Sequence, residues 1–290
     1  MKNKKVKIKL SGKDYEASLL PSTRKAQFKD ILTHEFKTLL LVGAWLLLFF
    51  LPILSIEIFS NIFVYTYITQ NNGALTPEEK KAFEMMVTLI QEASLVFGYL
   101  VFSVGIAGSL RIIRNLVYGE VIFFKDDFIT GIKKYWKLCL GVAFVFGLLQ
   151  GSTEMLGYFV NGYSNESYLY IFHGFATGVF YLFVVPILFF YVSLSMTYEL
   201  SFAKCLGLAI RFALSNFLVC IPFSLILFAL HFIGYIGILL VVILLDIALV
   251  FLLGPFYLLL WHLYVTSRFD RYINEKQFPD VYKKGLRKGE

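Results

Sequence analysis

Long apolar stretches separated by short polar breaks dominate the chain after its first 37 residues. A helix needs about 20 apolar residues to cross the hydrocarbon core of a bilayer, and several of these stretches exceed that length. The pattern predicts six membrane-spanning helices, at about 38–68, 86–112, 137–162, 169–197, 216–234 and 236–265. The fold class expected is therefore an all-α polytopic membrane protein.

Three amphipathic segments come directly before the first, third and fifth predicted spans. Their apolar side chains recur at helical spacing, with polar or basic residues on other faces: Phe28, Ile31, Leu32 and Phe36; Phe124, Phe128, Ile132 and Trp136; Phe202, Leu206, Ala209 and Ala213. Such segments lie in the plane of the membrane interface. We expect three units, each an interfacial helix followed by a helical hairpin. The alternative is that these are ordinary juxtamembrane pieces without a repeat.

The second span has a strong helix start. Thr76, Pro77 and Glu79 form a capping-box pattern with proline at the first helical position. Gly98 is the first helix breaker that follows, and membrane helices tolerate glycine. A helix from Pro77 to about Val117 would be roughly 60 Å long at 1.5 Å per residue. Because the hydrocarbon core is about 30 Å thick, the helix is expected to project beyond the bilayer.

Prolines within spans are expected to kink their helices, because proline lacks an N–H group and clashes with the preceding turn. The returning spans place glycine or proline about one third of the way from their inner ends. The prolines concerned are Pro52 and Pro222 in outgoing spans, and Pro186 and Pro255 in returning spans.

The segment before the first interfacial helix has a different pattern. Val6, Ile8 and Leu10 alternate with lysines ahead of a Ser-Gly turn, which indicates a small β-hairpin. A disordered basic tail is the open alternative. We divide the chain into an N-terminal tail or β-hairpin (1–25), a six-helix membrane domain (26–265) and a basic tail (266–290).

Composition and charge fix the class of protein and its orientation. Of the 290 residues, 58% are hydrophobic and only 16% are charged, whereas a soluble domain has about 25% charged residues. The 27 lysines and arginines are unevenly placed: ten in 1–37, six in 111–137, two in 197–216, seven after 265, and only two, Lys80 and Lys81, on the other side. The positive-inside rule therefore predicts cytoplasmic termini. The same distribution explains the net charge of +7 without a nucleic-acid partner.

No catalytic chemistry is evident in the sequence. It contains no phosphate-binding loop, no H-E-x-x-H or G-x-S-x-G motif and no cysteine pair. The three cysteines, Cys139, Cys205 and Cys220, have no metal-ligand or redox spacing. We expect no catalytic residue, no metal and no cofactor, and hence no enzyme.

Polar residues inside the predicted spans are the main candidates for an internal site, because membrane-embedded charges are usually functional. Asp246, His231, Glu154 and Glu92 fall toward the outer halves of their spans, as does Glu57. They could line an outward-open cavity for a cation, a proton or a sugar, or the glutamates could simply reach water. Asp246 is expected near the bilayer middle, facing the bundle as a buried polar clamp or as a proton or cation site. Its best partner is His231, with Tyr99 and Tyr181 as alternatives.

The loop LRIIRNLVYGEVIFFKDDFITGIKKYWK resembles the signature loop of the YesL-type family of small bacterial membrane proteins. The matching residues are Arg114, Gly119, Glu120, Asp127, Phe128, Lys133 and Trp136, and the ending FDRYINEKQFPDVYKKGLRK is also similar. The chain lacks the Gly-Pro that the family often has in its second span. The resemblance implies a bacterial cell-membrane location and a link to carbohydrate uptake. It brings no established reaction and no active-site residues.

These observations favour a non-enzymatic accessory or scaffold protein that works beside a carbohydrate transport system. The expected contacts are anionic lipid headgroups and a partner protein such as a sugar ABC permease. Candidates for the cytoplasmic docking surface are Arg114, Glu120, Asp127, Lys133, Lys134 and Trp136. The alternative is a small-solute or ion-coupled transporter with Asp246 in its path, and an enzyme acting on lipid is a third reading.

Overall fold

The computed structural model describes residues 20–71, 74–163, 167–233 and 238–287, and these residues form helices and connecting turns without a strand. The β-hairpin predicted for the N-terminal segment lies outside the described residues. The helices are α1 (Arg24–His34), α2 (Phe36–Gln70), α3 (Pro77–Tyr118), α4 (Phe124–Tyr163), α5 (Ser167–Val179), α6 (Val185–Thr197), α7 (Phe202–Ser215), α8 (Phe217–Ile233), α9 (Leu239–Ala248), α10 (Gly254–Phe269) and α11 (Glu275–Gln277). Three π-helical segments join some of them: η2 (Phe180–Val184), η4 (Leu249–Leu253) and η5 (Asp270–Asn274).

Five helices are long and apolar enough to cross a membrane: Phe36–Gln70, Pro77–Tyr118, Phe124–Asn161, Ser167–Thr197 and Leu239–Gln277. A sixth crossing is formed if α7 and the first part of α8 count as one broken span, since their axes meet at 95°. Many large apolar side chains on these helices are exposed, as expected of lipid-facing surfaces. The all-α architecture is therefore that of a multi-pass membrane protein.

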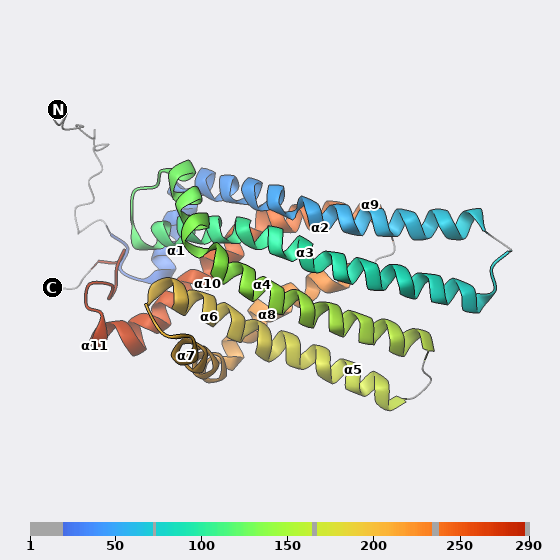
Figure 1. Cartoon of the computed structure of the whole chain (residues 1–290). Coiled ribbons are helices and arrows are strands. Elements are labelled where there is room, and N and C mark those ends of the chain that lie inside the picture. Colours follow the sequence, from blue (N-terminus) through green and yellow to red (C-terminus); the bar gives the residue numbers. More distant parts are fainter. Residues whose placement is uncertain (1–19, 72–73, 164–166, 234–237, 288–290) are drawn as a thin grey trace, which may run out of the picture.

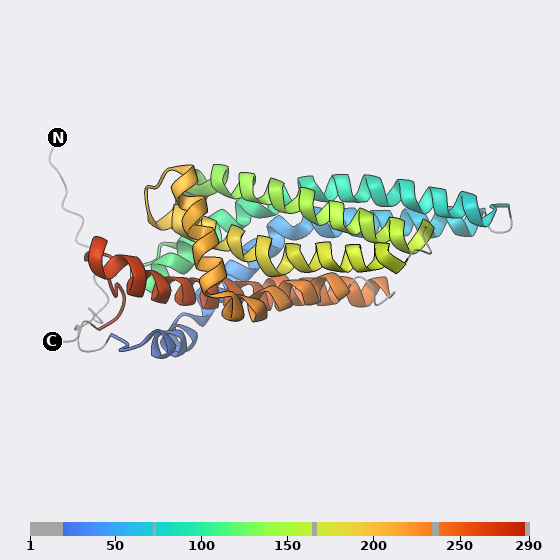
Figure 2. The ribbon, with the colours of Figure 1, turned by 90° about the horizontal axis from the view of Figure 1, so that it is seen from below.

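The long helices run side by side as hairpins of unequal length. In Figures 1 and 2 the α2–α3 hairpin extends furthest from the end of the bundle that carries α1 and α11, the α4–α5 hairpin less far, and α8 with α9 least. The two described ends of the chain meet, because the N–H of Arg287 donates to the carbonyl oxygen of Pro21 at 3.0 Å. We call this the closed end of the bundle.

The start predicted for α3 is confirmed. Thr76 Oγ1 accepts a hydrogen bond from the N–H of Glu79 at 3.3 Å, and Glu79 Oε2 accepts from the N–H of Thr76 at 2.8 Å. The helix begins at Pro77 and continues to Tyr118, where Gly119 ends it in the left-handed conformation with φ of 65°. With 42 residues, α3 is about 63 Å long at 1.5 Å per residue.

The three predicted interfacial helices have different outcomes. The first is α1, which Glu35 separates from α2, and the third is α7, which Asn216 separates from α8. The side chain of Asn216 donates to the carbonyl oxygen of Phe212 at 2.8 Å, and this local bond competes with helix continuation.

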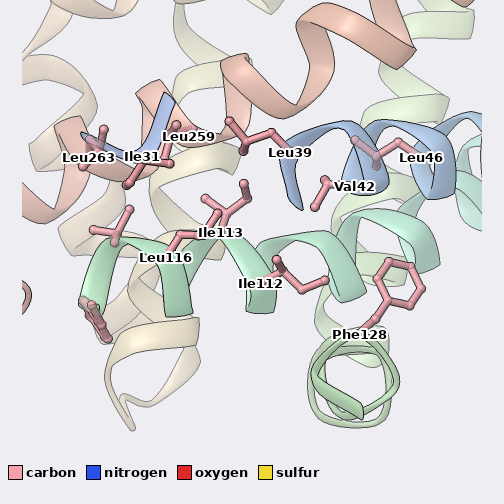
Figure 3. Packing of buried hydrophobic residues seen from close by; sticks show 12 residues of the cluster. Ile31, Leu39, Val42, Leu46, Ile112, Ile113, Leu116, Phe128, Leu259 and Leu263 are labelled. Atoms are coloured by element: carbon pink, nitrogen blue, oxygen red, sulfur yellow. The ribbon is translucent and has the colours of Figure 1, made fainter. Parts of the chain in front are cut away.

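The second predicted interfacial helix is not a separate helix. Hydrogen bonding in α4 continues from Phe124 through the third predicted span, so the expected break is not present there. The direction of the first turns nevertheless differs from that of the bundle. Figure 3 looks along the axis of the turn that carries Phe128, whereas the part of α3 that carries Ile112 and Leu116 runs across the view.

The prolines of the returning spans are accommodated by π-helical turns. Pro186 is the second residue after η2, and Pro255 is the second residue after η4. A widened turn gives room for a proline ring and for the carbonyl group that has lost its usual N–H donor. Both returning spans therefore have a π-helical turn directly before the turn that contains the proline.

The largest buried cluster lies toward the closed end of the bundle (Figure 3). It joins residues from α1, α2, α3, α4 and α10: Ile31, Leu39, Val42, Leu46, Ile112, Ile113, Leu116, Val117, Tyr118, Phe128, Leu259 and Leu263. Ile31 of α1 and Phe128 of α4 both belong to this cluster, so both segments pack against the bundle.

Candidate functional site

Three of the predicted docking residues are exposed on the first turns of α4. Lys133 and Lys134 are exposed, and the side chain of Trp136 is 42% exposed. The ammonium group of Lys137 lies 5.6 Å from the centroid of the Trp136 ring. We call this face, made by Lys133, Lys134, Trp136 and Lys137, the α4 basic face.

Close packing against α3 holds the α4 basic face in place. A Cβ atom on Gly131 would lie 3.0 Å from the Cα of Gly108 and 2.6 Å from the Cβ of Arg111. The ring of Phe128 covers Gly108 and would be 2.6 Å from a Cβ atom there. Glycines allow such close approach between helix backbones, so the first turns of α4 are seated on α3.

The other three predicted docking residues make contacts within the chain. Arg114 Nη1 donates to Tyr135 Oη at 2.9 Å, and Glu120 Oε1 pairs with Lys284 Nζ at 2.6 Å. Asp127 Oδ2 accepts from the N–H of Phe123 at 2.9 Å and so caps the start of α4. The structure therefore separates the six candidates into a group exposed on α4 and a half-buried group with polar partners within the chain.

Sequence reasoning missed a buried polar network at the closed end, which we call the terminal clasp. Its centre is an ion pair between Arg24 Nη2 and Asp270 Oδ2 at 2.7 Å, whose side chains are only 11% and 10% exposed. Asp270 Oδ1 also accepts from Asn274 Nδ2 at 2.9 Å and from the N–H of Lys283 at 3.1 Å. Gln27 Nε2 donates to the carbonyl oxygen of Gly285 at 3.1 Å. The clasp thus ties the C-terminal segment to α1 and α10.

One more buried group joins the terminal clasp. The hydroxyl group of Tyr198 donates to Asn274 Oδ1. Burial raises the pKa of Tyr198 well above its usual range, so the phenol stays protonated and remains a donor. No motif in the sequence connects residues this far apart, and only the fold brings them together.

The predicted acidic residues of the outer half are brought near one another. Glu57, Glu92, Glu154 and Asp246 lie on helices that contact one another, α2 with α3, α3 with α4 and α2 with α9. Glu154 Oε1 accepts from Gln150 Nε2 at 2.7 Å. The result is a group of acidic side chains shared by α2, α3, α4 and α9.

Asp246 itself is half-buried in α9, and no hydrogen bond to its side chain is found within the described residues. The side chain of His231 lies outside what the structure describes, so the expected contact between the two stays a prediction. Within the described ranges, no group of three or more His, Cys, Asp or Glu side chains is placed to hold a metal ion.

A polar cleft of about 190 Å³ lies between the outer parts of α2, α3 and α4. It does not include Asp246, and its lining residues are Ser60, Asn61, Val64, Glu84, Val87, Thr88, Gln91 and Tyr158. The phenol of Tyr158 donates across it to Glu84 Oε2 at 3.4 Å. Gln91 in its lining is the neighbour of Glu92 in the sequence, so the cleft is close to the acidic group.

Comparison of the chain with protein-family models found no match, and neither the curated proteins nor the solved structures gave one. The features of the chain that bear on function are therefore the α4 basic face and the terminal clasp at the closed end, together with the group of acidic side chains.

Proposed function

We propose that this protein is a non-enzymatic membrane protein that docks a partner through the α4 basic face, as an accessory or scaffold component of carbohydrate uptake. The observation that carries this proposal is the construction of that face. Lys133, Lys134 and Trp136 are exposed, while the turns that hold them are fixed to α3 through Gly131. A preformed face loses little conformational entropy on binding. The link to sugar uptake, and to a sugar ABC permease as partner, comes from the resemblance to the YesL-type family.

The proposed orientation places the closed end in the cytoplasm of a bacterial cell, with six crossings arranged as three units. The distribution of basic residues supports it, as does the meeting of both described chain ends, which requires an even number of crossings. Cysteines introduced at Lys80 and Lys276 should label from opposite sides of the membrane. Labelling of both from outside would contradict the orientation.

Crosslinking and affinity capture from native membranes test the docking proposal. Wild-type protein should capture a permease component, and the double variant Lys133→Glu/Lys134→Glu should lose it without a change in melting temperature, because both side chains are exposed. The matched control is Arg271→Glu/Lys276→Glu, which reverses two exposed charges elsewhere at the closed end. If the first variant keeps its partner as well as the control variant does, these lysines do not hold the partner and the docking proposal fails.

The acidic group favours a second candidate, an ion-coupled or small-solute transporter. Glu57 and Asp246 are half-buried on the neighbouring helices α2 and α9, and carboxylates within membrane spans commonly mark ion or substrate pathways. Asp246→Asn keeps the shape of the side chain and removes its charge. For a transporter, this variant should fold normally and lose uptake into proteoliposomes. Normal uptake would leave Asp246 with a structural role only.

A further inference from the structure

Arg114 differs from Arg24 and Lys284, also at the closed end, because no carboxylate within the described residues pairs with it. Arg24 pairs with Asp270, and Lys284 pairs with Glu120. Arg114 instead has neutral neighbours: Nη1 donates to Tyr135 Oη at 2.9 Å and to the carbonyl oxygen of Met196 at 3.3 Å. Its charge is therefore not balanced by any described acidic side chain in ion-pair range.

The guanidinium group of Arg114 also has unused donors. Its Nε atom is buried without a hydrogen-bond partner in the described part of the chain, and Nη2 makes no hydrogen bond there. A partly buried cation with unused donors is costly unless an anion completes its hydrogen bonds. Arginine matches phosphate and carboxylate particularly well, because its planar group can donate two parallel hydrogen bonds.

Tyr135 adds a second donor at the same place. Its side chain is only 4% exposed, and its hydroxyl oxygen accepts from Arg114. Among the described residues no acceptor takes the phenol's own proton, so that O–H remains able to donate. The ammonium group of Lys134 lies 5.5 Å from the centroid of the Tyr135 ring. Arg114 of α3 and Tyr135 of α4 therefore meet at one place, and Lys134 lies over the ring of that tyrosine.

The residues around Arg114 and Tyr135 indicate which kind of anion binds there. Arg114 lies near the end of α3, beside the first turns of α4 with their exposed lysines and Trp136. Tryptophan with lysine at a helix end is typical of the membrane–water interface, where anionic phospholipids attract basic residues. A soluble phosphate offers the same chemistry but would have to come from the aqueous side.

We propose that Arg114 and Tyr135, with Lys134 at the rim, bind a phosphate group, and that its source is the phosphodiester of an anionic phospholipid in the adjoining leaflet. One negative charge would balance Arg114. This site is distinct in mechanism from partner docking, because it needs Arg114 and Tyr135 as well as the exposed lysines.

Lipid retention and thermal stability of the full-length protein test the site. In nanodiscs of phosphatidylcholine with and without phosphatidylglycerol, the wild-type protein should melt at higher temperature when phosphatidylglycerol is present. Native mass spectrometry should detect a retained phosphatidylglycerol molecule. Inorganic phosphate, added alone to the detergent-solubilised protein, should give little protection. Equal protection by inorganic phosphate would support a soluble phosphate ligand and overturn the lipid source.

Variants separate ligand binding from a structural role. Tyr135→Phe keeps the ring and the charge of Arg114, and it should weaken phosphatidylglycerol binding about tenfold, the value of one hydrogen bond to a charged group. Arg114→Ala should abolish retention. The matched control is Arg111→Lys, one turn earlier on α3. Arg111 already forms an ion pair within the chain, since its Nε lies 3.7 Å from Asp127 Oδ1. It should retain lipid as the wild type does.

Two outcomes would overturn the proposal. In one, Tyr135→Phe retains as much phosphatidylglycerol as the wild type, so that the phenol donates nothing to a phosphate. In the other, Arg111→Lys loses as much lipid as Arg114→Ala, so that retention does not depend on Arg114 in particular. If Arg114→Ala does not fold, Tyr135→Phe and the lipid comparison of the wild-type protein still decide the question.

Discussion

Gly43 shows how a single residue sets the distance between two helices. A Cβ atom added there would lie 2.0 Å from the carbonyl oxygen of Phe251 in η4. The usual helical donor to that oxygen would be the N–H of residue 255, which is a proline. The Pro255 side chain also lies 3.2 Å from the added atom. The backbone of α2 therefore packs so closely on η4 and Pro255 that only glycine fits at position 43.

At this scale we predict that Gly43→Ala destabilises the protein by about 1–3 kcal/mol, because overpacking forces the two backbones apart. The melting temperature in detergent measures the effect. Gly141→Ala is the matched control, since a Cβ atom on Gly141 in α4 meets no atom within 4 Å. It should be neutral or stabilising by up to about 1 kcal/mol. Equal melting temperatures for the two variants would contradict the close contact.

Among the elements, α3 has the most sharply defined ends. Thr76 and Glu79 satisfy each other's backbone N–H groups at its start, and Gly119 closes its other end. The outer part of the helix packs on α2, where the rings of Tyr67 and Phe83 stack with centroids 3.8 Å apart. The projecting hairpin is thus stabilised both by its cap and by packing.

For this element we predict that Thr76→Ala costs about 1 kcal/mol locally. Hydrogen exchange should become faster in the first two turns of α3 and stay unchanged around Gly105. Thr69→Ala, an exposed threonine on the neighbouring hairpin arm, is the control and should change neither region. Unchanged exchange in Thr76→Ala would show that packing alone holds the helix start.

At the scale of the whole molecule, the terminal clasp closes the bundle. Arg24 belongs to α1, Asp270 follows α10, and Gln27 reaches both Val117 of α3 and Gly285. The chain's two described ends are therefore held against the ends of α3 and α10.

We predict that Asp270→Asn destabilises the closed end by about 3–5 kcal/mol, because it leaves Arg24 buried without its counter-charge. The C-terminal segment should then be cleaved by trypsin at Lys283 and Lys284 at lower protease concentration. Asp126→Asn, which changes an exposed carboxylate on α4, should leave both the melting temperature and the cleavage unchanged. If Asp270→Asn behaves like that control, the C-terminal segment is held by other contacts.

Features that depend on neighbouring residues could be predicted from the sequence. The capping box of α3 needs only Thr76, Pro77 and Glu79, and its prediction is confirmed. The separate α1 and α7 were also expected. The break expected within α4 was not found, since amphipathic spacing does not tell whether a helix ends or bends between two segments.

The sequence by itself determined that the chain is helical and membrane-spanning, because hydrophobic length and capping are local properties. Only the tertiary structure decided which polar residues have partners within the chain. Arg114, Glu120 and Asp127 occur in the same motif as Lys133 and Trp136, yet contacts to Tyr135, Lys284 and Phe123 occupy the first three. The physical reason is that burial of a polar group depends on partners from distant parts of the chain, and a sequence pattern carries no information on those distances.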